Sequence, residues 1–304
     1  MFSELFEQAA EELSTIQDFL RFATSQFQAN DLFFGHGTDN AWDEAVALLF
    51  SVLHLPYDSK PEVIFARLTT NEKRTILSLI EKRIEAKVPV PYLTQEAWFA
   101  HLPFYVDQRV LIPRSPFAEL IEQQFTPWVD PSQINRILDL CTGSGCMAIA
   151  AATYLPETQI DAVDISADAL AVAEMNVKKH QLAEHVNLIE SNLFSALSGQ
   201  SYDIIMSNPP YVSQAEMATL PAEYKVEPSL ALSAGVDGLD IVRTILKEAP
   251  HYLTPKGMLF VEVGNSADAV MEAFPDLPLI WLEFERGDSE VFCISKEQLD
   301  SVTF

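Results

Sequence analysis

The sequence predicts an α/β fold, in which a mostly parallel, seven-stranded sheet with an antiparallel edge carries helices on both faces. From Asn135 onward, short apolar segments alternate with segments of helical spacing, which is typical of parallel sheets. Up to about residue 90 only helical spacing occurs, which adds a small helical domain in front. We therefore expect a helical domain over residues 1–90, a β-hairpin linker over 91–116 and the α/β domain over 117–304.

The N-terminal domain is expected to contain three helices. The first covers residues 4–22, because apolar residues recur along it at helical spacing: Leu5, Ala9, Leu13, Ile16 and Leu20. The same pattern returns over 41–53 and 71–86, and prolines at positions 56 and 61 separate these segments. This part of the sequence holds no phosphate-binding loop and no metal-binding cluster, so we expect its helices to help recognise a partner.

The linker is expected to form a β-hairpin. Aromatic and β-branched residues over 98–112 surround a polar break at residues 107–109, where we place the turn. Beyond Pro113 and Pro116, a helix is expected over 117–125.

The α/β domain alternates strands with helices. The expected strands are residues 136–140, 159–165, 186–190, 203–207, 258–263, 279–284 and 290–295. The expected helices are residues 143–154, 166–180, 239–253 and 267–274, the second with Ser166 as its N-cap. The closing pair of strands predicts the antiparallel edge of the sheet.

A glycine-containing loop follows the first strand of this domain and opens a helix. It reads Asp139-Leu140-Cys141-Thr142-Gly143-Ser144-Gly145, and its glycines let the backbone approach a ligand closely. Asp164 ends the next strand, where a carboxylate can hold the ribose hydroxyls of an adenosine-containing ligand. This geometry suits NAD and S-adenosylmethionine alike.

Two details favour S-adenosylmethionine. Asp139 ends the first strand, where it could pair with the ammonium group of that ligand. A dinucleotide site usually has a third glycine, and this chain has Ala148 there instead. Asn192 ends the third strand, where its amide either hydrogen-bonds the adenine ring or only caps the strand.

The most specific motif is Asn208-Pro209-Pro210-Tyr211, which follows the fourth strand and therefore faces the same crevice as the glycine loop. An amide nitrogen is a poor nucleophile, because its lone pair is delocalised into the carbonyl. Two acceptors on its hydrogens, the side-chain oxygen of Asn208 and the carbonyl of Pro209, would return electron density to it. Consecutive prolines carry no competing N–H, and the ring of Tyr211 can pack on a planar amide. The motif indicates methylation of such a nitrogen.

Charge and cysteine usage limit the other possibilities. The net charge is −25, from 19 Lys plus Arg against 44 Asp plus Glu, which repels nucleic acid and attracts basic partners. The three cysteines show no paired spacing, and no histidine or further cysteine completes a metal set near Cys141 and Cys146. No signal peptide or membrane-spanning segment is recognisable, so we expect a cytoplasmic protein that binds neither membrane nor nucleic acid.

The chain resembles the protein-glutamine methyltransferases that act on translation proteins. Most of the chain takes part in the resemblance, and the specific segments are residues 92–94, 111–114, 139–145, 208–211, 227–232 and 237–239. The resemblance implies a class I (Rossmann-like) methyltransferase domain and S-adenosylmethionine as cofactor. It implies that the cofactor is bound by Asp139, Thr142, Gly143, Ser144, Gly145, Asp164, Asn192 and Asn208. It also implies catalytic roles for Asn208, Pro209, Pro210 and Tyr211, substrate contacts for Arg114, Tyr211 and Glu227, and no metal.

Two branches of this family are open alternatives. The release-factor branch has Pro-Arg-Pro-Asp-Thr-Glu after the hairpin, whereas this chain has Pro113-Arg114-Ser115-Pro116-Phe117. Together with residues 96–99, this segment is similar to the corresponding sequence in the branch that methylates a glutamine of ribosomal protein L-three in the large subunit. The acidity of the chain also favours this branch, because ribosomal proteins are generally basic and an acidic enzyme attracts them. The loop departs from the commonest family form at Cys141, where the family has glycine.

Three other classes of function compete with this interpretation. A DNA adenine methyltransferase uses the same motif on an extruded base, but it would need a basic surface for phosphates, which this acidic chain lacks. A ligand-binding scaffold without catalysis would have no need of an intact Asn208-Pro209-Pro210-Tyr211. A nicotinamide oxidoreductase fits the glycine loop but leaves that motif unexplained.

Overall fold

The computed structural model describes residues 4–285 and 290–302. The chain divides into two compact units, each made of several segments. The helical unit comprises Met1–Ala97, Val106–Gln108 and Pro221–Val226, and the sheet unit comprises Trp98–Tyr105, Arg109–Leu220 and Glu227–Phe304. A short segment beyond the Asn-Pro-Pro-Tyr motif is therefore part of the helical unit.

From residue 4 onward, the helical unit contains five α-helices: α1 (Glu4–Glu12), α2 (Ile16–Ala29), α3 (Ala41–Val52), α4 (Thr70–Glu85) and α5 (Val90–Thr94). Two 3-10 helices, Pro61–Phe65 and Ala222–Val226, also belong to it. The single helix expected over residues 4–22 is wrong, because Thr15 begins a new helix. Its hydroxyl accepts from the amide of Asp18, and the Asp18 carboxylate accepts from the amide of Thr15, which forms a capping box.

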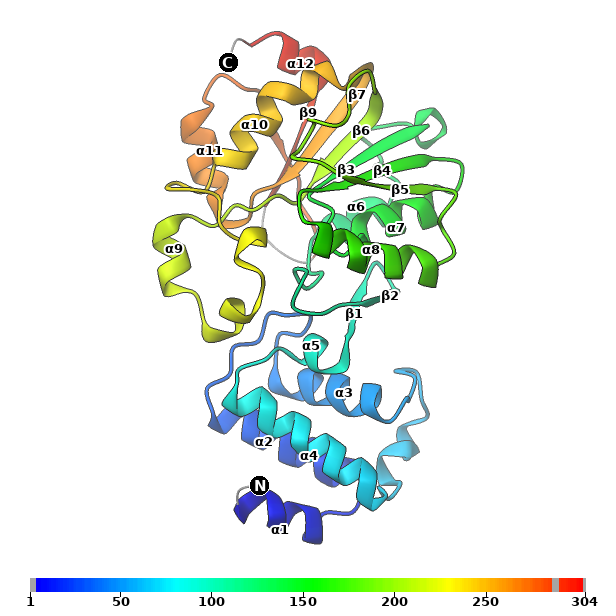
Figure 1. Cartoon of the computed structure of the whole chain (residues 1–304), viewed down its shortest axis with the longest axis vertical. Helices are drawn as coiled ribbons and strands as arrows, with labels where there is room; N and C mark the ends of the chain where they lie inside the picture. The colour runs from blue at the N-terminus through cyan, green and yellow to red at the C-terminus, as the bar shows by residue number, and fades with distance from the viewer. Residues whose placement is uncertain (1–3, 286–289, 303–304) are drawn as a thin grey trace. The chain divides into compact units, whose positions relative to one another are not determined.

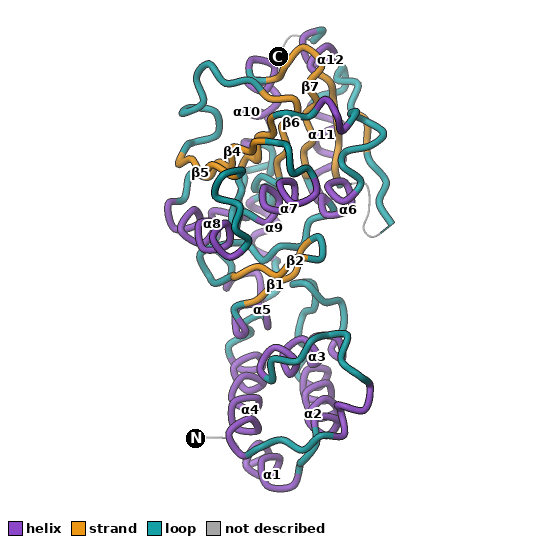
Figure 2. The backbone as a smooth tube through the Cα atoms, turned by 90° about the vertical axis from the view of Figure 1, so that its right-hand side faces the viewer, coloured by secondary structure: helices purple, strands orange, loops and turns teal. Residues whose placement is uncertain are grey.

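The core of the helical unit lies between α2, α3 and α4, which Figure 2 shows as neighbouring helices. Fully buried side chains from all three meet there: Phe19, Phe27, Leu48, Ile76 and Ile80. Charged residues are also buried in this unit: Arg83 of α4 has no exposed surface, and Glu44 and Glu223 are 3% and 2% exposed.

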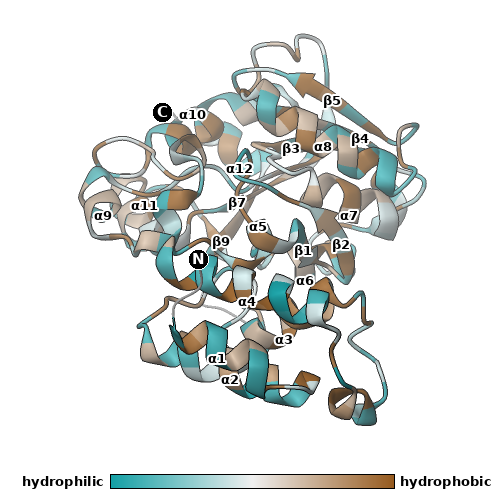
Figure 3. Cartoon of the chain, turned by 60° about the horizontal axis from the view of Figure 1, so that its bottom comes forward, coloured by the Kyte–Doolittle hydropathy of each residue, from teal (hydrophilic) through white to brown (hydrophobic). Residues whose placement is uncertain are grey.

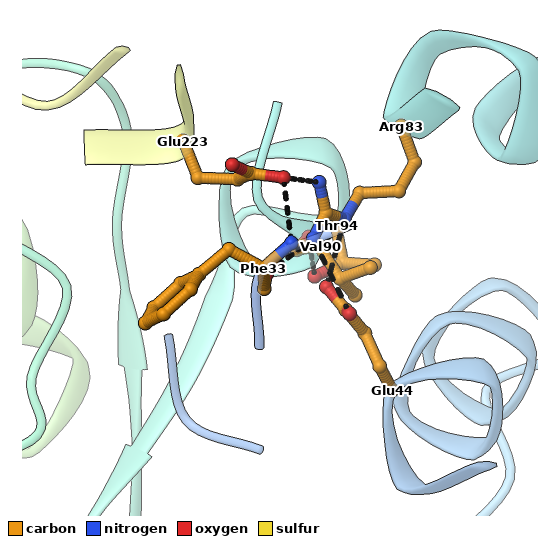
Figure 4. A network of polar contacts seen from close by, with 6 residues as sticks. All are labelled: Phe33, Glu44, Arg83, Val90, Thr94 and Glu223. Atoms are coloured by element: carbon orange, nitrogen blue, oxygen red, sulfur yellow. Dashed lines mark hydrogen bonds and ion pairs between the residues drawn. The ribbon is translucent and has the colours of Figure 1, made fainter. Parts of the chain in front are cut away.

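Arg83 is held by a network of polar contacts (Figure 4). Its Nε lies 2.9 Å from Glu44 Oε1, its Nη1 lies 3.0 Å from Glu223 Oε1, and its Nη2 donates to the carbonyl of Phe33 at 2.8 Å. Glu223 also accepts from the amide of Phe33 at 3.1 Å. The network therefore holds the segment Pro221–Val226 in the helical unit through a fully desolvated cation.

The hairpin is present, but its turn lies earlier than expected. Its strands are β1 (Glu96–Phe99) and β2 (Leu102–Tyr105), and the turn is formed by Ala100 and His101 with φ of 47° and 60°. Two consecutive residues with positive φ match the right-handed twist of a hairpin, although neither is the usual glycine or asparagine. The polar residues 107–109, where we placed the turn, follow the second strand.

The sheet unit contains the seven-stranded sheet that the sequence predicts (Figure 1). Its order is β5-β4-β3-β6-β7-β9-β8. The strands are β3 (Arg136–Leu140), β4 (Gln159–Asp164), β5 (Val186–Glu190), β6 (Tyr202–Ser207), β7 (Leu253–Glu262), β8 (Ile280–Trp281) and β9 (Val291–Ser295). β9 runs antiparallel to both β7 and β8, which confirms the expected edge, while all other pairs are parallel. β8 is shorter than the six residues expected at 279–284.

Seven α-helices accompany the sheet in the part of the unit that the structure describes. They are α6 (Phe117–Glu122), α7 (Cys146–Tyr154), α8 (Ala167–Lys179), α9 (Gln214–Thr219), α10 (Asp240–Glu248), α11 (Ala267–Ala273) and α12 (Lys296–Asp300). Ser166 is the N-cap of α8, as expected. The helix predicted over 239–253 ends at Glu248 and continues as a 3-10 turn at Ala249–His251, because Pro250 has no N–H for the helical ladder.

The core of the sheet unit has one layer on each face of the sheet. Alternate side chains of β3 separate into these layers, since Ile137 packs with α6 and α7, whereas Leu138 and Leu140 pack with α10. α7 is apolar along almost its whole length, as its colour in Figure 3 shows, and is therefore buried on all sides. Among the described residues, no helix is long and apolar enough to cross a membrane.

Candidate active site

The glycine loop and the Asn-Pro-Pro-Tyr motif follow adjacent parallel strands, β3 and β6. From β3 the chain adds β4 and β5 on one side and then places β6 on the other, so a topological switch point lies between β3 and β6. Ligands of open α/β sheets bind outside the carboxyl ends of the strands at such a point. A pocket of about 930 Å³, its open mouth included, lies there within the sheet unit.

The pocket is built from the ends of four strands and from two flanking segments. The strand ends contribute Cys141, Gly143, Val163, Asp164, Ile165, Ser166, Ser191, Asn192, Leu193, Asn208 and Pro210. The flanking segments contribute Arg109, Val110 and Leu111 before α6, and Pro228, Leu230, Ala231 and Ser233 after the motif. Of the predicted cofactor ligands, Gly143, Asp164, Asn192 and Asn208 line the pocket, whereas Asp139, Thr142, Ser144 and Gly145 do not.

The glycine loop requires left-handed backbone at three positions. Cys141, Gly143 and Gly145 have φ of 62°, 55° and 79°. A Cβ on Gly143 would meet no atom within 4 Å, so this glycine leaves open space at the pocket. A Cβ on Gly145 would lie 3.2 Å from that of Ala173, so this glycine serves the close approach of α7 and α8. The positive φ of Cys141 explains why glycine is the usual residue there in the family that the sequence resembles.

Asp139 lies behind the loop and is fully buried. Its Oδ2 accepts from the Thr142 hydroxyl at 2.6 Å and from the Ala148 amide at 3.2 Å, while its Oδ1 has no hydrogen-bond partner among the described residues. Burial raises the pKa of Asp139 to about 7, although the bonds from Thr142 and Ala148 lower it. A buried carboxylate oxygen without a donor is costly, and an ammonium group would supply that donor.

Asp164 is part of the pocket wall and is already oriented by the backbone. Its Oδ2 accepts from the Gly143 amide and its Oδ1 from the Ser166 amide, both at 2.9 Å. Each oxygen keeps a lone pair for a ribose hydroxyl. Beside it, Ile165 is 52% exposed and lines the pocket, which suits a flat apolar ring. Sequence reasoning missed Ile165, although an apolar residue between a strand end and an N-cap was the available signal.

These residues fit S-adenosylmethionine. Asp164 would hold the ribose, Asp139 Oδ1 the amino group and Ile165 the adenine, with Asn192 at the same wall. When bound, this cofactor supplies a methyl group on a positively charged sulfonium. The enzyme must then hold the acceptor nitrogen of its substrate beside that methyl group.

The Asn-Pro-Pro-Tyr motif is held from several sides. Pro209 is buried, Pro210 lines the pocket, and the carbonyl of Tyr211 accepts from the Ser266 hydroxyl at 2.9 Å. Two glycines make room for Tyr211. A Cβ on Gly264 would lie 2.5 Å from its ring, and a Cβ on Gly238 would lie 2.5 Å from its carbonyl oxygen.

Asn208 directly follows β6, and the neighbouring strand β7 ends at Glu262, whose pKa is raised to about 7 by burial. Glu262 is only 3% exposed and also accepts from the Ser115 hydroxyl. Sequence reasoning missed this buried carboxylate, although an acidic residue directly after the apolar run of residues 258–261 was the available signal.

Arg114 and Glu227, predicted to contact the substrate, are bound to each other. The two guanidinium nitrogens Nη1 and Nη2 each lie 2.7 Å from one Glu227 oxygen, and Glu227 also accepts from the Ile112 amide at 3.1 Å. Neither side chain lines the pocket. The pocket is lined by Arg109–Leu111, which precede Arg114, and by the segment that begins at Pro228, directly after Glu227. The pair therefore fastens the wall at Arg109–Leu111 to the wall that begins at Pro228.

A sheet with this strand order, opening its glycine loop and an amide-bearing motif onto one pocket, is the arrangement of class I methyltransferases, which use S-adenosylmethionine. Comparison with known proteins agrees with this assignment. The methyltransferase small domain family matches residues 123–225.

Two relatives are similar over nearly the whole chain. The ribosomal protein uL3 glutamine methyltransferase of Bordetella pertussis is 47% identical over 292 residues, covering 96% of this chain and 98% of the relative. That of Neisseria gonorrhoeae is 49% identical over 296 residues, covering 97% and 99%. The chain belongs to the family of ribosomal protein uL3 glutamine methyltransferases, which confirms the family and the branch expected from the sequence.

Proposed function

We propose that this protein transfers the methyl group of S-adenosylmethionine to the side-chain amide nitrogen of a glutamine in ribosomal protein uL3 of the large subunit. The observation that carries the proposal is the near-full-length relationship to two proteins named for this reaction. A net charge of −25 supports a basic ribosomal protein as the partner. We place the reaction in the cytoplasm, where ribosomal proteins are made.

The motif explains how the chain activates an amide. The Asn208 side-chain oxygen and the Pro209 carbonyl accept the two hydrogens of the glutamine amide, which directs the nitrogen lone pair toward the methyl group. The ring of Tyr211 packs on the amide plane. No general base is needed, because the nitrogen loses its proton after the methyl group has been transferred. Alignment of this kind can supply roughly 7–11 kcal/mol of a barrier.

A transfer assay with three acceptors tests the proposal. Purified enzyme and methyl-labelled S-adenosylmethionine are incubated with uL3 from cells that lack this enzyme, with unmethylated release factors, and with unmethylated DNA. We expect label on uL3 alone, and no label with Asn208→Ala, which keeps the Asp139 and Asp164 ligands of the cofactor. Label on release factors or DNA but not on uL3 would overturn the proposed substrate.

We further propose that residues 1–90 act as a separate domain that helps recognise uL3, with residues 91–116 as the link and 117–304 as the methyl-transfer domain. Removal of residues 1–88 should abolish the preference for uL3 over release factors. A truncated protein that kept this preference would overturn the assignment.

A further inference from the structure

Between the Asn-Pro-Pro-Tyr motif and the pocket wall that begins at Pro228, the chain passes into the helical unit and returns. This excursion, residues 213–226, contains α9 in the sheet unit and the 3-10 helix Ala222–Val226 in the helical unit. It starts shortly after the motif and stops just before the wall. The excursion therefore borders the candidate site at both of its ends.

The sheet unit fixes the chain on either side of the pocket wall. At the far end of the wall, the carbonyl of Leu232 accepts from the amide of Val212 at 2.8 Å, beside the motif. At the near end, Arg114 holds Glu227 through two bonds of 2.7 Å. The wall between Glu227 and Leu232 is thus held in place by contacts in which the excursion takes no part.

The excursion itself buries very little. α9 has no buried residue. Of residues 213–226, all of which the structure describes, only Glu223 is buried, and it is 2% exposed. A segment with so few buried apolar groups opens locally at low cost unless another contact holds it.

Glu223 and Tyr224 supply such contacts, both in the part of the excursion that belongs to the helical unit. Glu223 Oε1 lies 3.0 Å from Arg83 Nη1 and accepts from the Phe33 amide at 3.1 Å (Figure 4). The ring centre of Tyr224 lies 4.7 Å from that of His36. Because separating a buried ion pair leaves a charge uncompensated, the bond to Arg83 holds the excursion more firmly than its small buried surface could.

We propose that Glu223 is a positioning residue, which through Arg83 keeps residues 213–226 in the conformation that binds uL3 beside the pocket. The inference rests on the proposed function and names a part of the chain that holds the protein substrate. A glutamine that reaches Asn208 brings its flanking residues to the chain that follows Tyr211, which is the excursion.

Loss of the bond should affect the protein substrate and spare the cofactor. The excursion binds uL3 only in those molecules in which it is in place, so a smaller fraction of such molecules raises KM for uL3. Glu223→Ala should raise this KM roughly 10-fold, as expected if about a tenth of the molecules keep the excursion in place. KM for S-adenosylmethionine should stay unchanged, because the pocket wall is held without the excursion.

The test measures KM for uL3 and for S-adenosylmethionine in wild type, Glu223→Ala and the matched control Glu44→Ala. Glu44 is also buried and lies 2.9 Å from Arg83, but it belongs to α3 rather than to the excursion. Each variant leaves Arg83 with one carboxylate, so a general effect on the helical unit would appear in both.

We expect both variants to unfold at lower urea concentration than wild type, and only Glu223→Ala to have a raised KM for uL3. An equal rise in Glu44→Ala, or an unchanged KM for uL3 in Glu223→Ala, would overturn the inference. If Glu223→Ala does not fold, Tyr224→Ala decides the question, since it removes the ring contact with His36 and no buried charge. It should raise KM for uL3 in the same direction, and an unchanged KM would again overturn the inference.

Limited proteolysis with trypsin gives a measurement that needs no substrate. Lys225 is exposed and directly follows the two residues that hold the excursion, so trypsin cuts after it when this part of the chain opens. Cleavage after Lys225 should be roughly 10-fold faster in Glu223→Ala than in wild type, and unchanged in Glu44→Ala. Equal rates in all three proteins would overturn the positioning role. Absence of transfer to uL3 by wild type would overturn the proposed function, whereas the cleavage rates still decide whether Glu223 holds the excursion.

Discussion

Gly264 is the position where a single added methyl group should separate activity from stability. It has φ of 47°, and a Cβ there would lie 2.5 Å from Cε2 and 2.7 Å from Cζ of Tyr211. Left-handed backbone costs an alanine about 1–2 kcal/mol of stability. The ring must also move by about 1 Å to reach ordinary carbon–carbon contact of about 3.5 Å. Since a misplacement of about 1 Å can cost about 100-fold in rate, Gly264→Ala should lower kcat about 100-fold.

Gly199→Ala provides the control for backbone strain. Gly199 lies in an exposed turn with φ of 78°, and a Cβ there would meet no atom within 4 Å. Both variants should lose a similar 1–2 kcal/mol or so of unfolding free energy in urea, but only Gly264→Ala should lose kcat with uL3. If Gly264→Ala kept the kcat of wild type, the position of the Tyr211 ring would not matter for transfer, and the packing argument would be refuted.

Three further substitutions have defined outcomes. Arg83→Met leaves the buried Glu44 without its cation and should lower the free energy of unfolding in urea by about 3–5 kcal/mol. The loss should be smaller at acidic than at alkaline pH, because at acidic pH the buried carboxyl group binds a proton in the folded state. A loss that does not depend on pH would contradict this. Arg114→Ala removes the cation from the Glu227 carboxylate, and it should cost about 3 kcal/mol and raise KM for S-adenosylmethionine as two pocket walls separate. A wild-type KM would show that the pair does not hold the pocket. Cys141→Gly relieves a positive φ and should stabilise the fold by up to about 1 kcal/mol, whereas a loss of stability would show that thiol packing outweighs strain.

Local patterns made most of the sheet unit predictable. The strands and their order along the chain are visible in the sequence, because each is a short apolar segment beside a segment with helical spacing. The strand that ends at Glu190 has the predicted bounds. The two motifs were predictable as neighbours, since the carboxyl ends of parallel strands meet at one edge. The break at Thr15 was also legible as a capping box, but the helical spacing of apolar residues runs across it.

The features that sequence reasoning missed depend on long-range contacts or on backbone geometry. Arg83 meets Glu223 across 140 positions, so no local pattern pairs them. The hairpin turn at Ala100 and His101 lacks the glycine or asparagine that positive φ usually selects. The closeness of Gly264 to the Tyr211 ring depends on the folded backbone, so it could be found only in three dimensions.

The central claim is that Asn208 and Pro209 direct methyl transfer to an amide nitrogen, and tandem mass spectrometry of the product tests it most directly. uL3 methylated by the purified enzyme is digested, and the modified atom is located from the fragments. We expect one methyl group on the side-chain nitrogen of a glutamine, and none after reaction with Asn208→Ala. A methyl group on a lysine, an arginine or a carboxylate, or unchanged glutamine methylation by Asn208→Ala, would contradict the account.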